Sequence, residues 1–209
     1  MKKVFVCSLL FVIFSLSAWA DDVDCLSYKL NPKIELETPD WTKEVVQPLK
    51  PMDLLHGDVI ATLDENYDII GDTTSIEDGF CISLKSVHAT IGYSDFLVKI
   101  DSSHIPESCA YNAVLAHEDE HIRAYLSVID NYQEKIIKSV YSAANSIMPV
   151  FVSDESQIDG ALDLLNKKMQ EHPDLILINQ KIQAEQEIRN KQVDENSSND
   201  RIKQCMVYD

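Results

Sequence analysis

The chain has 209 residues, of which 35 are acidic and 18 are lysine or arginine, so its formal net charge at pH 7 is −17. A surface this anionic repels phosphate backbones and anionic lipid headgroups. We therefore expect neither nucleic acid nor a membrane surface as a partner. The length is sufficient for one domain with a hydrophobic core and appended helices.

The first twenty residues have the pattern of a secretory signal peptide. Lys2 and Lys3 give a basic start, residues 4–16 are almost entirely apolar, and residues 18–20 have the small-x-small cleavage pattern. The apolar run is shorter than a membrane span requires, so we expect cleavage after Ala20 rather than an anchor. Cleavage removes two lysines and no acidic residue, which changes the formal net charge from −17 to −19. We therefore expect an exported protein, periplasmic or secreted, with no membrane insertion after cleavage.

Four cysteines remain after the predicted cleavage, because Cys7 leaves with the signal peptide. An even number of cysteines in an exported chain predicts two disulfides, and four cysteines allow three pairings. We expect Cys81 to pair with Cys109 and Cys25 to pair with Cys205. The second of these bonds would join the two ends of the chain.

Residues 21–100 carry the signals of strands and turns. Residues 33–38 alternate polar and apolar side chains, as a half-buried strand does. Residues 59–70 are interpreted as two short strands around a turn at residues 64–66. Residues 81–100 are interpreted as a second hairpin, which turns near residues 92–94.

Helix signals dominate from residue 106 onward. No glycine or proline interrupts residues 107–148, and Pro149 follows, which predicts one long helix. A second helix is expected from a cap at residues 153–154 to about Glu171, and a third after Pro173.

Strands followed by helices predict an α+β fold, with N-terminal antiparallel strands and hairpins, a long helix, and further C-terminal helices. The predicted organisation is a signal peptide (residues 1–20), an α+β core (21–150), C-terminal helices (151–193) and a polar tail (194–209).

The long predicted helix contains the sequence HEDEH at residues 117–121, which has the H-E-x-x-H spacing. At about 100° per residue, His117, Glu118 and His121 lie on the same arc as the apolar side chains of this helix. Asp119 and Glu120 lie on the opposite arc and are expected to face solvent. A carboxylate on an apolar face is costly unless it is paired or belongs to a site. The apolar arc is made of Ala110, Val114, Tyr125, Val128, Ile129, Tyr132 and Ile136.

Two imidazoles one helical turn apart can bind a single metal ion. They are separated by about 6 Å along the axis and can converge on one ion at about 2.0–2.1 Å per bond. Zinc suits imidazole, takes a third protein ligand in catalytic sites and leaves one position for water. Glu118, next to the first histidine, could accept a proton from that water.

The stretch AHEDEHIRAY resembles the active-site helix of zincin metallopeptidases. Together with the signal peptide, the preceding hairpin and the cysteine, it is similar to small exported bacterial proteins described as predicted zinc-dependent proteases. The resemblance covers residues 81–129 and implies a zincin-like core, His117 and His121 as zinc ligands, and Glu118 as general base. It also implies a peptide substrate aligned along an edge strand of the preceding hairpin. No glycine stands three residues after His121 and no histidine six after it, so a gluzincin-like site with a glutamate ligand is implied.

The third ligand is expected from another element, because Glu134 would lie about 20 Å from His121 along a continuous helix. Glu155 is the expected ligand, since it begins the next helix, which an antiparallel return would bring over the site. An acidic residue in a first helical turn is also favoured by the helix dipole alone. Asp159, one turn further on, could be a ligand or could orient a histidine. The other candidates are Glu171, His172, His88 and His104.

The sequence therefore predicts an exported zinc-dependent hydrolase, most specifically a metallopeptidase that acts on a protein or peptide with Glu118 as its base. The alternative is a non-catalytic exported binding protein with a zincin-like fold and a structural or vestigial metal site.

Overall fold

A computed structural model describes residues 25–50, 56–195 and 204–205 of this chain. The predicted signal peptide and most of the predicted tail lie outside the described residues. Within the described ranges, no helix combines the length and the apolar character needed to cross a membrane.

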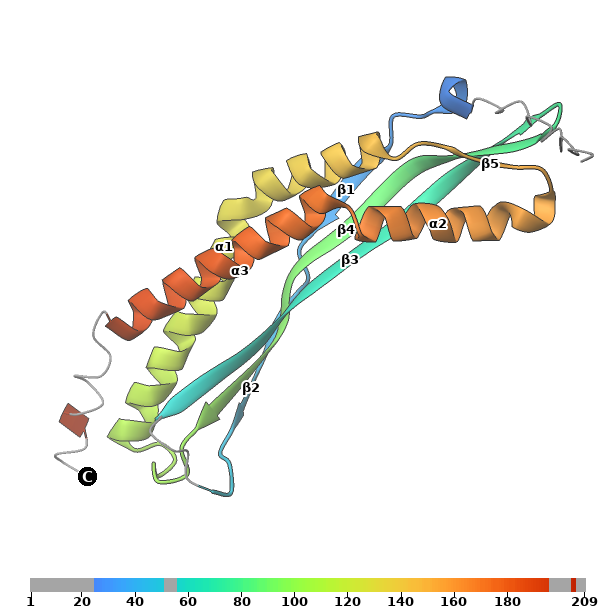
Figure 1. The fold of residues 1–209 in the computed structure, drawn as a ribbon. Coiled ribbons are helices and arrows are strands. Elements are labelled where there is room, and N and C mark those ends of the chain that lie inside the picture. Colours follow the sequence, from blue (N-terminus) through green and yellow to red (C-terminus); the bar gives the residue numbers. More distant parts are fainter. Residues whose placement is uncertain (1–24, 51–55, 196–203, 206–209) are drawn as a thin grey trace, which may run out of the picture.

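One antiparallel pair of strands runs the length of the molecule (Figure 1). These strands are β3 (Gly57–Ile76) and β4 (Gly79–Ile100), which pair along their whole length around a turn at Glu77 and Asp78. The register shifts twice, between Ala61 and Leu63 and between Ile70 and Gly71. Such bulges bend a strand and increase its twist, which accounts for the curved shape of the pair.

The other edge of β4 is occupied by three short strands in succession. β1 (Lys33–Glu37) and β2 (Thr42–Val46) pair with it in parallel, and β5 (Val150–Val152) pairs with it antiparallel at residues 80–82. β4 is therefore the central strand, and the outer edge of β3 has no strand partner among the described residues. A short 3-10 helix, η1 (Cys25–Tyr28), precedes β1.

The strand predicted at residues 33–38 is confirmed, whereas both predicted hairpins are wrong. Residues 64–66 and 92–94 lie inside continuous strands, and Asp64 pairs directly with Gly92. Gly92 does not form a turn but lets Pro39 pack closely against β4, because a Cβ atom at Gly92 would lie 2.6 Å from Pro39 Cδ. The chain reverses instead at Glu77 and Asp78.

Helices follow the strands, as predicted, and the fold is α+β. α1 (Cys109–Ser146) is the predicted long helix. η2 (Glu155–Gln157) leads into α2 (Ile158–Gln170), and α3 (Pro173–Glu195) follows. Because α3 extends to Glu195, the expectation that the polar tail begins at residue 194 is wrong for Asp194 and Glu195. The remaining tail residues lie outside the described part of the chain, apart from residues 204–205.

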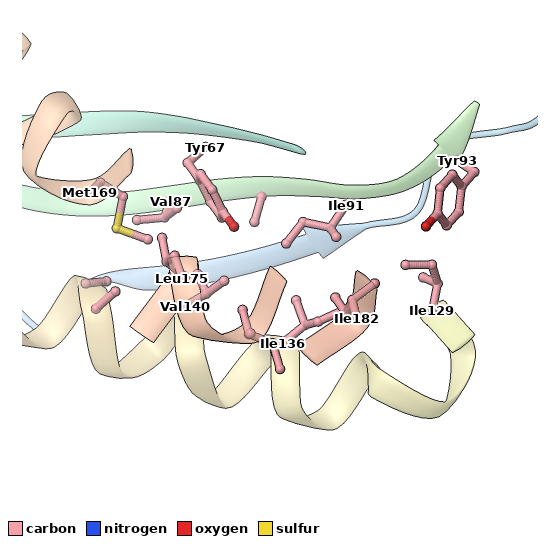
Figure 2. Close-up of a cluster of buried hydrophobic side chains, with 14 of the residues drawn as sticks. Tyr67, Val87, Ile91, Tyr93, Ile129, Ile136, Val140, Met169, Leu175 and Ile182 are labelled. Carbon is pink, nitrogen blue, oxygen red and sulfur yellow. The ribbon is translucent and has the colours of Figure 1, made fainter. Parts of the chain in front are cut away.

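The hydrophobic core lies between the sheet and the helices (Figure 2). Alternate residues of β4, such as Val87 and Ile91, are at most 1% exposed and face α1 and α3. The helices contribute Ile136 and Ile182 to the same cluster. Burying one such side chain contributes about 1.5–3 kcal/mol, so this apolar cluster fixes α3 beside α1.

Two disulfides are present, but the predicted pairing is wrong. Cys25 pairs with Cys81 and Cys109 with Cys205, with Cα–Cα distances of 5.6 and 5.3 Å. Cys81 lies near the first residue of β4, whereas Cys109 begins the helix that follows the last residue of β4. The unbroken strand therefore keeps these two cysteines apart. Two disulfides are consistent with an oxidising, exported environment.

Candidate metal centre

α1 presents both histidines of the HEDEH sequence toward the interior. The helix begins behind Ser108, whose Oγ accepts a hydrogen bond from the backbone N–H of Tyr111 at 3.2 Å. His117 is 9% exposed and Glu118 is 3% exposed. The prediction that these residues share the buried face of the helix is confirmed.

α3 brings a carboxylate to the two histidines. Figure 1 shows the C-terminal end of α3 beside the N-terminal half of α1, and Asp194 lies in this last turn. Its Oδ1 lies 3.1 Å from His121 Nε2 and 3.4 Å from His117 Nε2. The two Nε2 atoms are 3.3 Å apart. These three residues form a group that could hold a metal ion, because their ligand atoms lie within 4.8 Å of one another.

The mutual distances of these three atoms fit tetrahedral zinc coordination. With bonds of about 2.0–2.1 Å, two ligand atoms of a tetrahedral zinc site lie about 3.3 Å apart. The observed separations are 3.1, 3.3 and 3.4 Å. If one ion bound all three atoms in tetrahedral geometry, one position would stay open for water or substrate.

Asn190 orients one of the histidines. Its Oδ1 lies 3.1 Å from His121 Nδ1. Because an amide oxygen can only accept, Nδ1 is the donor in this contact, and Nε2 is the ring atom that a neutral His121 would offer to a metal ion. Asn190 and Asp194 are one turn apart on α3. Asn190 contacts Nδ1 of His121 and Asp194 contacts Nε2, so α3 holds both nitrogens of this ring.

The electrostatic environment favours a neutral His117. Burial lowers the pKa of His117, and the neighbouring His121 lowers it further, against the opposing effect of Asp194 and Glu120. A neutral imidazole is the form that binds metal ions. The ring is therefore ready to act as a ligand at neutral pH.

Glu118 is held in a tight, buried position at the start of β3. A Cβ atom at Gly57 would overlap Glu118 Oε1 and would lie 2.7 Å from Val114 Cγ1, so a glycine is required for this close approach. Burial raises the pKa of Glu118 to about 8, and the negative charges of Asp58, Asp194 and Asp119 add to this effect. Asp119 is only partly exposed and forms an ion pair with Lys43 at 2.8 Å. The expectation that Asp119 faces solvent is therefore only partly correct.

Glu155 is not part of the group, and its prediction as the third ligand is wrong. It lies in η2, directly after β5, and β5 pairs with residues 80–82 of β4. The histidines lie at the opposite end of the strand, where Gly57 pairs with Ile100 and contacts Glu118. These two ends are roughly 60 Å apart along β4. α2, the helix after η2, does not reach the histidines. α3 is the helix that returns to them.

The other candidates for the third ligand also lie outside the metal group. Asp159 is in the first turn of α2, at the same end as Glu155. His88 lies between Glu35 and Glu37 on the sheet. His104 contacts His56, with Nε2 and Nδ1 separated by 3.2 Å.

Glu171 and His172 connect α2 with α3. His172 Nδ1 accepts a hydrogen bond from the backbone N–H of Asp174 at 3.2 Å, and its Nε2 lies 2.8 Å from Ser146 Oγ. Glu171 caps the C-terminal end of α2 and contacts Lys167. Both residues therefore stabilise the junction between the helices.

Asp194 is not among the predicted ligands, because its polar neighbours predict a tail that begins at this residue. A signal for it exists in the sequence, since Ile178, Ile182, Gln186, Asn190 and Asp194 follow one another at intervals of four residues. Residues four apart lie about 40° apart around a helix, so these five form a row that winds slowly around α3. The row changes from apolar to polar where α3 reaches the histidines.

Comparisons of this chain with protein-family models, with curated proteins and with solved structures found no match. The zincin resemblance of the HEDEH helix therefore stays a prediction, and the function has to be inferred from the geometry of the group.

Proposed function

We propose that this protein is an exported zinc-dependent metallopeptidase with His117, His121 and Asp194 as metal ligands and Glu118 as general base. The observation that carries the proposal is the convergence of three ligand atoms, 3.1–3.4 Å from one another, beside a buried carboxylate.

The choice of metal follows from the ligand set. Two imidazole nitrogens and one carboxylate oxygen are ligands of catalytic zinc sites, and such sites keep one position open. Zinc, when bound, polarises a substrate carbonyl and lowers the pKa of water at the open position to about 7.

Glu118 supplies the proton transfers. A bound zinc ion would favour the ionised form of Glu118, whose pKa is about 8 without metal, and the carboxylate would then accept a proton as the water oxygen attacks the peptide carbonyl carbon. It then passes that proton to the leaving amine nitrogen as the C–N bond breaks. Its carboxyl group is buried against Gly57 at the start of β3, which limits its freedom to move during both transfers.

The outer edge of β3 offers a way to align an extended substrate. This edge has no strand partner among the described residues, and the strand begins at Gly57, in contact with Glu118. An extended peptide that adds to this edge through backbone hydrogen bonds would pass beside Glu118. The proposed substrate is therefore an extended segment of a protein or peptide.

The test combines zinc stoichiometry with hydrolysis of an unfolded protein substrate such as reduced, alkylated casein. The wild-type chain should bind about one zinc ion and cleave casein. His117→Ala should lose both properties, whereas Glu118→Gln should keep the zinc and lose activity by about 10²–10⁴-fold. Glu155→Ala is the matched control, because it removes an acidic residue at the far end of β4, and it should behave as wild type.

Two outcomes would overturn the proposal. Wild-type protein that remains free of zinc after metal loading would remove the metal centre. Zinc binding without casein cleavage, with Glu118→Gln indistinguishable from wild type, would instead support the exported binding protein with a structural metal site.

A further inference from the structure

The two disulfides of this chain differ in their access to solvent. Cys25 is 6% exposed and Cys81 is fully buried, whereas Cys109 is exposed and Cys205 is half-buried. A thiolate must reach a sulfur atom to open a disulfide. The Cys109–Cys205 bond is therefore the one that a reductant can attack while the protein stays folded.

This exposed disulfide connects the two chain segments that form the metal group. Cys109 is the first residue of α1, about 12 Å along the helix from His117. Cys205 follows Asp194 in the chain, beyond the end of α3. The bond thus attaches the chain beyond Asp194 to the helix that carries both histidines.

Asp194 is the ligand whose position depends most on such an attachment. It is the next-to-last residue of α3, and its side chain is 61% exposed, against 11% and 12% for the side chains of His117 and His121. The last turn of a helix lacks intrahelical partners for its carbonyl groups and frays readily. The two histidines, in contrast, lie in the interior of α1.

We propose that Cys109–Cys205 is a redox-modification site for dithiol reductants, and that the intact bond controls the metal centre by holding Asp194 beside His117 and His121. This inference rests on the proposed metal site. In the reaction, a dithiol gives two electrons and two protons to the disulfide, so that the dithiol becomes a disulfide and Cys109 and Cys205 become thiols. The covalent link between Cys205 and α1 is then broken, and the third ligand is lost to fraying of the last turn of α3. Oxidation of the two thiols by a second disulfide restores the site.

Thermodynamic linkage makes the effect reciprocal. If the disulfide strengthens zinc binding by a given factor, zinc must stabilise the disulfide against reduction by the same factor. Keeping the chain end close to α1 raises the local concentration of the third ligand, and we expect a factor of about ten.

The first experiment measures this linkage in the wild-type full chain. The protein is equilibrated with dithiothreitol in its reduced and oxidised forms, with free zinc fixed by a metal buffer, and the thiols are alkylated and counted by mass spectrometry. Saturating zinc should raise the ratio of reduced to oxidised dithiothreitol needed to open Cys109–Cys205 by about tenfold and leave Cys25–Cys81 unchanged. The His117→Ala/His121→Ala variant should show no zinc effect, which also controls for zinc binding by the free thiols.

The second experiment tests whether the disulfide acts through Asp194. Cys109→Ser/Cys205→Ser should weaken zinc binding by about tenfold. The same change combined with Asp194→Ala should cost no more than Asp194→Ala alone, because coupled residues are not additive. If the cysteine changes weaken zinc binding by the same factor in the wild-type chain and in Asp194→Ala, the proposal is overturned.

The failures of the two proposals are distinguishable. A wild-type chain that binds no zinc refutes the metal centre and, with it, the redox control. A wild-type chain that binds zinc, but in which zinc protects both disulfides equally or protects neither, refutes only the redox control.

Discussion

The two ends of β4 are covered by different kinds of side chain. At the Gly79 end, the buried residues are mostly apolar: Cys81, Ile82 and Leu165 are 0% exposed, and the buried polar residue Ser83 carries no charge. At the Ile100 end, the buried positions include Asp101, His104, His117 and Glu118. The disulfides differ in the same way, buried at the first end and exposed at the second.

This contrast places the proposed metal centre at one end of the sheet and a mostly apolar core at the other. Burying an ionisable side chain costs free energy that an apolar side chain of the same size does not. Titratable groups with shifted pKa values therefore concentrate at functional sites. The apolar end supplies the stability that allows the other end to keep its polar groups buried, and the two ends should respond differently to mutation.

The largest expected effect is at the apolar end. Leu165→Ala removes a fully buried side chain of α2 and should lower the free energy of unfolding by about 2–5 kcal/mol. Urea titration followed by circular dichroism measures this loss. The folded variant should bind zinc as tightly as wild type; weaker binding in the folded state would mean that the two ends are not independent.

The next effect is a pH dependence at the polar end. Burial raises the pKa of Glu118 to about 8 from 4.5, so the folded metal-free protein keeps a proton that the unfolded chain releases. Its contribution to stability is therefore present below about pH 4.5 and is lost as the pH rises through about 8, by on the order of 3 kcal/mol. Glu118→Gln cannot ionise, so its stability should fall less between pH 5 and pH 9. Thermal unfolding of both proteins in a chelator measures the difference, and parallel pH curves would contradict the burial of this carboxyl group.

A smaller effect is expected at Asn190. Asn190→Leu removes the acceptor for His121 Nδ1 and should weaken zinc binding by about 10–100-fold. Asn190→Asp keeps an oxygen acceptor at the same place and should keep most of the affinity. Competition with a chromophoric chelator measures both variants. Equal losses in the two would show that Asn190 acts through packing rather than through the hydrogen bond.

The smallest effect is at the start of α1. Ser108→Ala removes the side-chain cap and should lower the free energy of unfolding by about 1 kcal/mol. The histidines lie more than two turns further along the helix, so zinc affinity should stay the same. Thermal unfolding and zinc competition together decide whether this cap stabilises the helix alone.

The helical half of the fold could be predicted from sequence because its signals are local. Residues 107–148 contain no glycine or proline, and the apolar arc of the helix places His117, Glu118 and His121 in the interior. The structure gives α1 nearly the predicted bounds, Cys109–Ser146. The metal role of the two histidines remains the proposal tested above.

The strands were harder to predict because turn-forming residues can also lie inside a strand. Gly92 lies within β4 and makes room for Pro39, and the residues around Asp64 lie within β3. Only pairing over the whole length of the two strands distinguishes them from two separate hairpins, and that pairing is not local in sequence.

The missing parts of the candidate site depend on contacts between distant segments. Asp194 reaches His121 only because α3 returns antiparallel along α1, and the pairing of Cys109 with Cys205 depends on the same return. Glu155 follows His121 more closely in sequence, yet it lies at the far end of the sheet. The i, i+4 row that ends at Asp194 shows only that a helix could continue to this residue, next to Asn190 one turn before it.

The most direct test is a crystal structure of the zinc-loaded protein with anomalous data collected at the zinc absorption edge. The predicted result is one strong anomalous peak about 2.0–2.1 Å from the Nε2 atoms of His117 and His121 and from a carboxylate oxygen of Asp194. A peak bound by Glu155, or no peak between α1 and α3 in zinc-saturated crystals, would contradict the proposed metal centre.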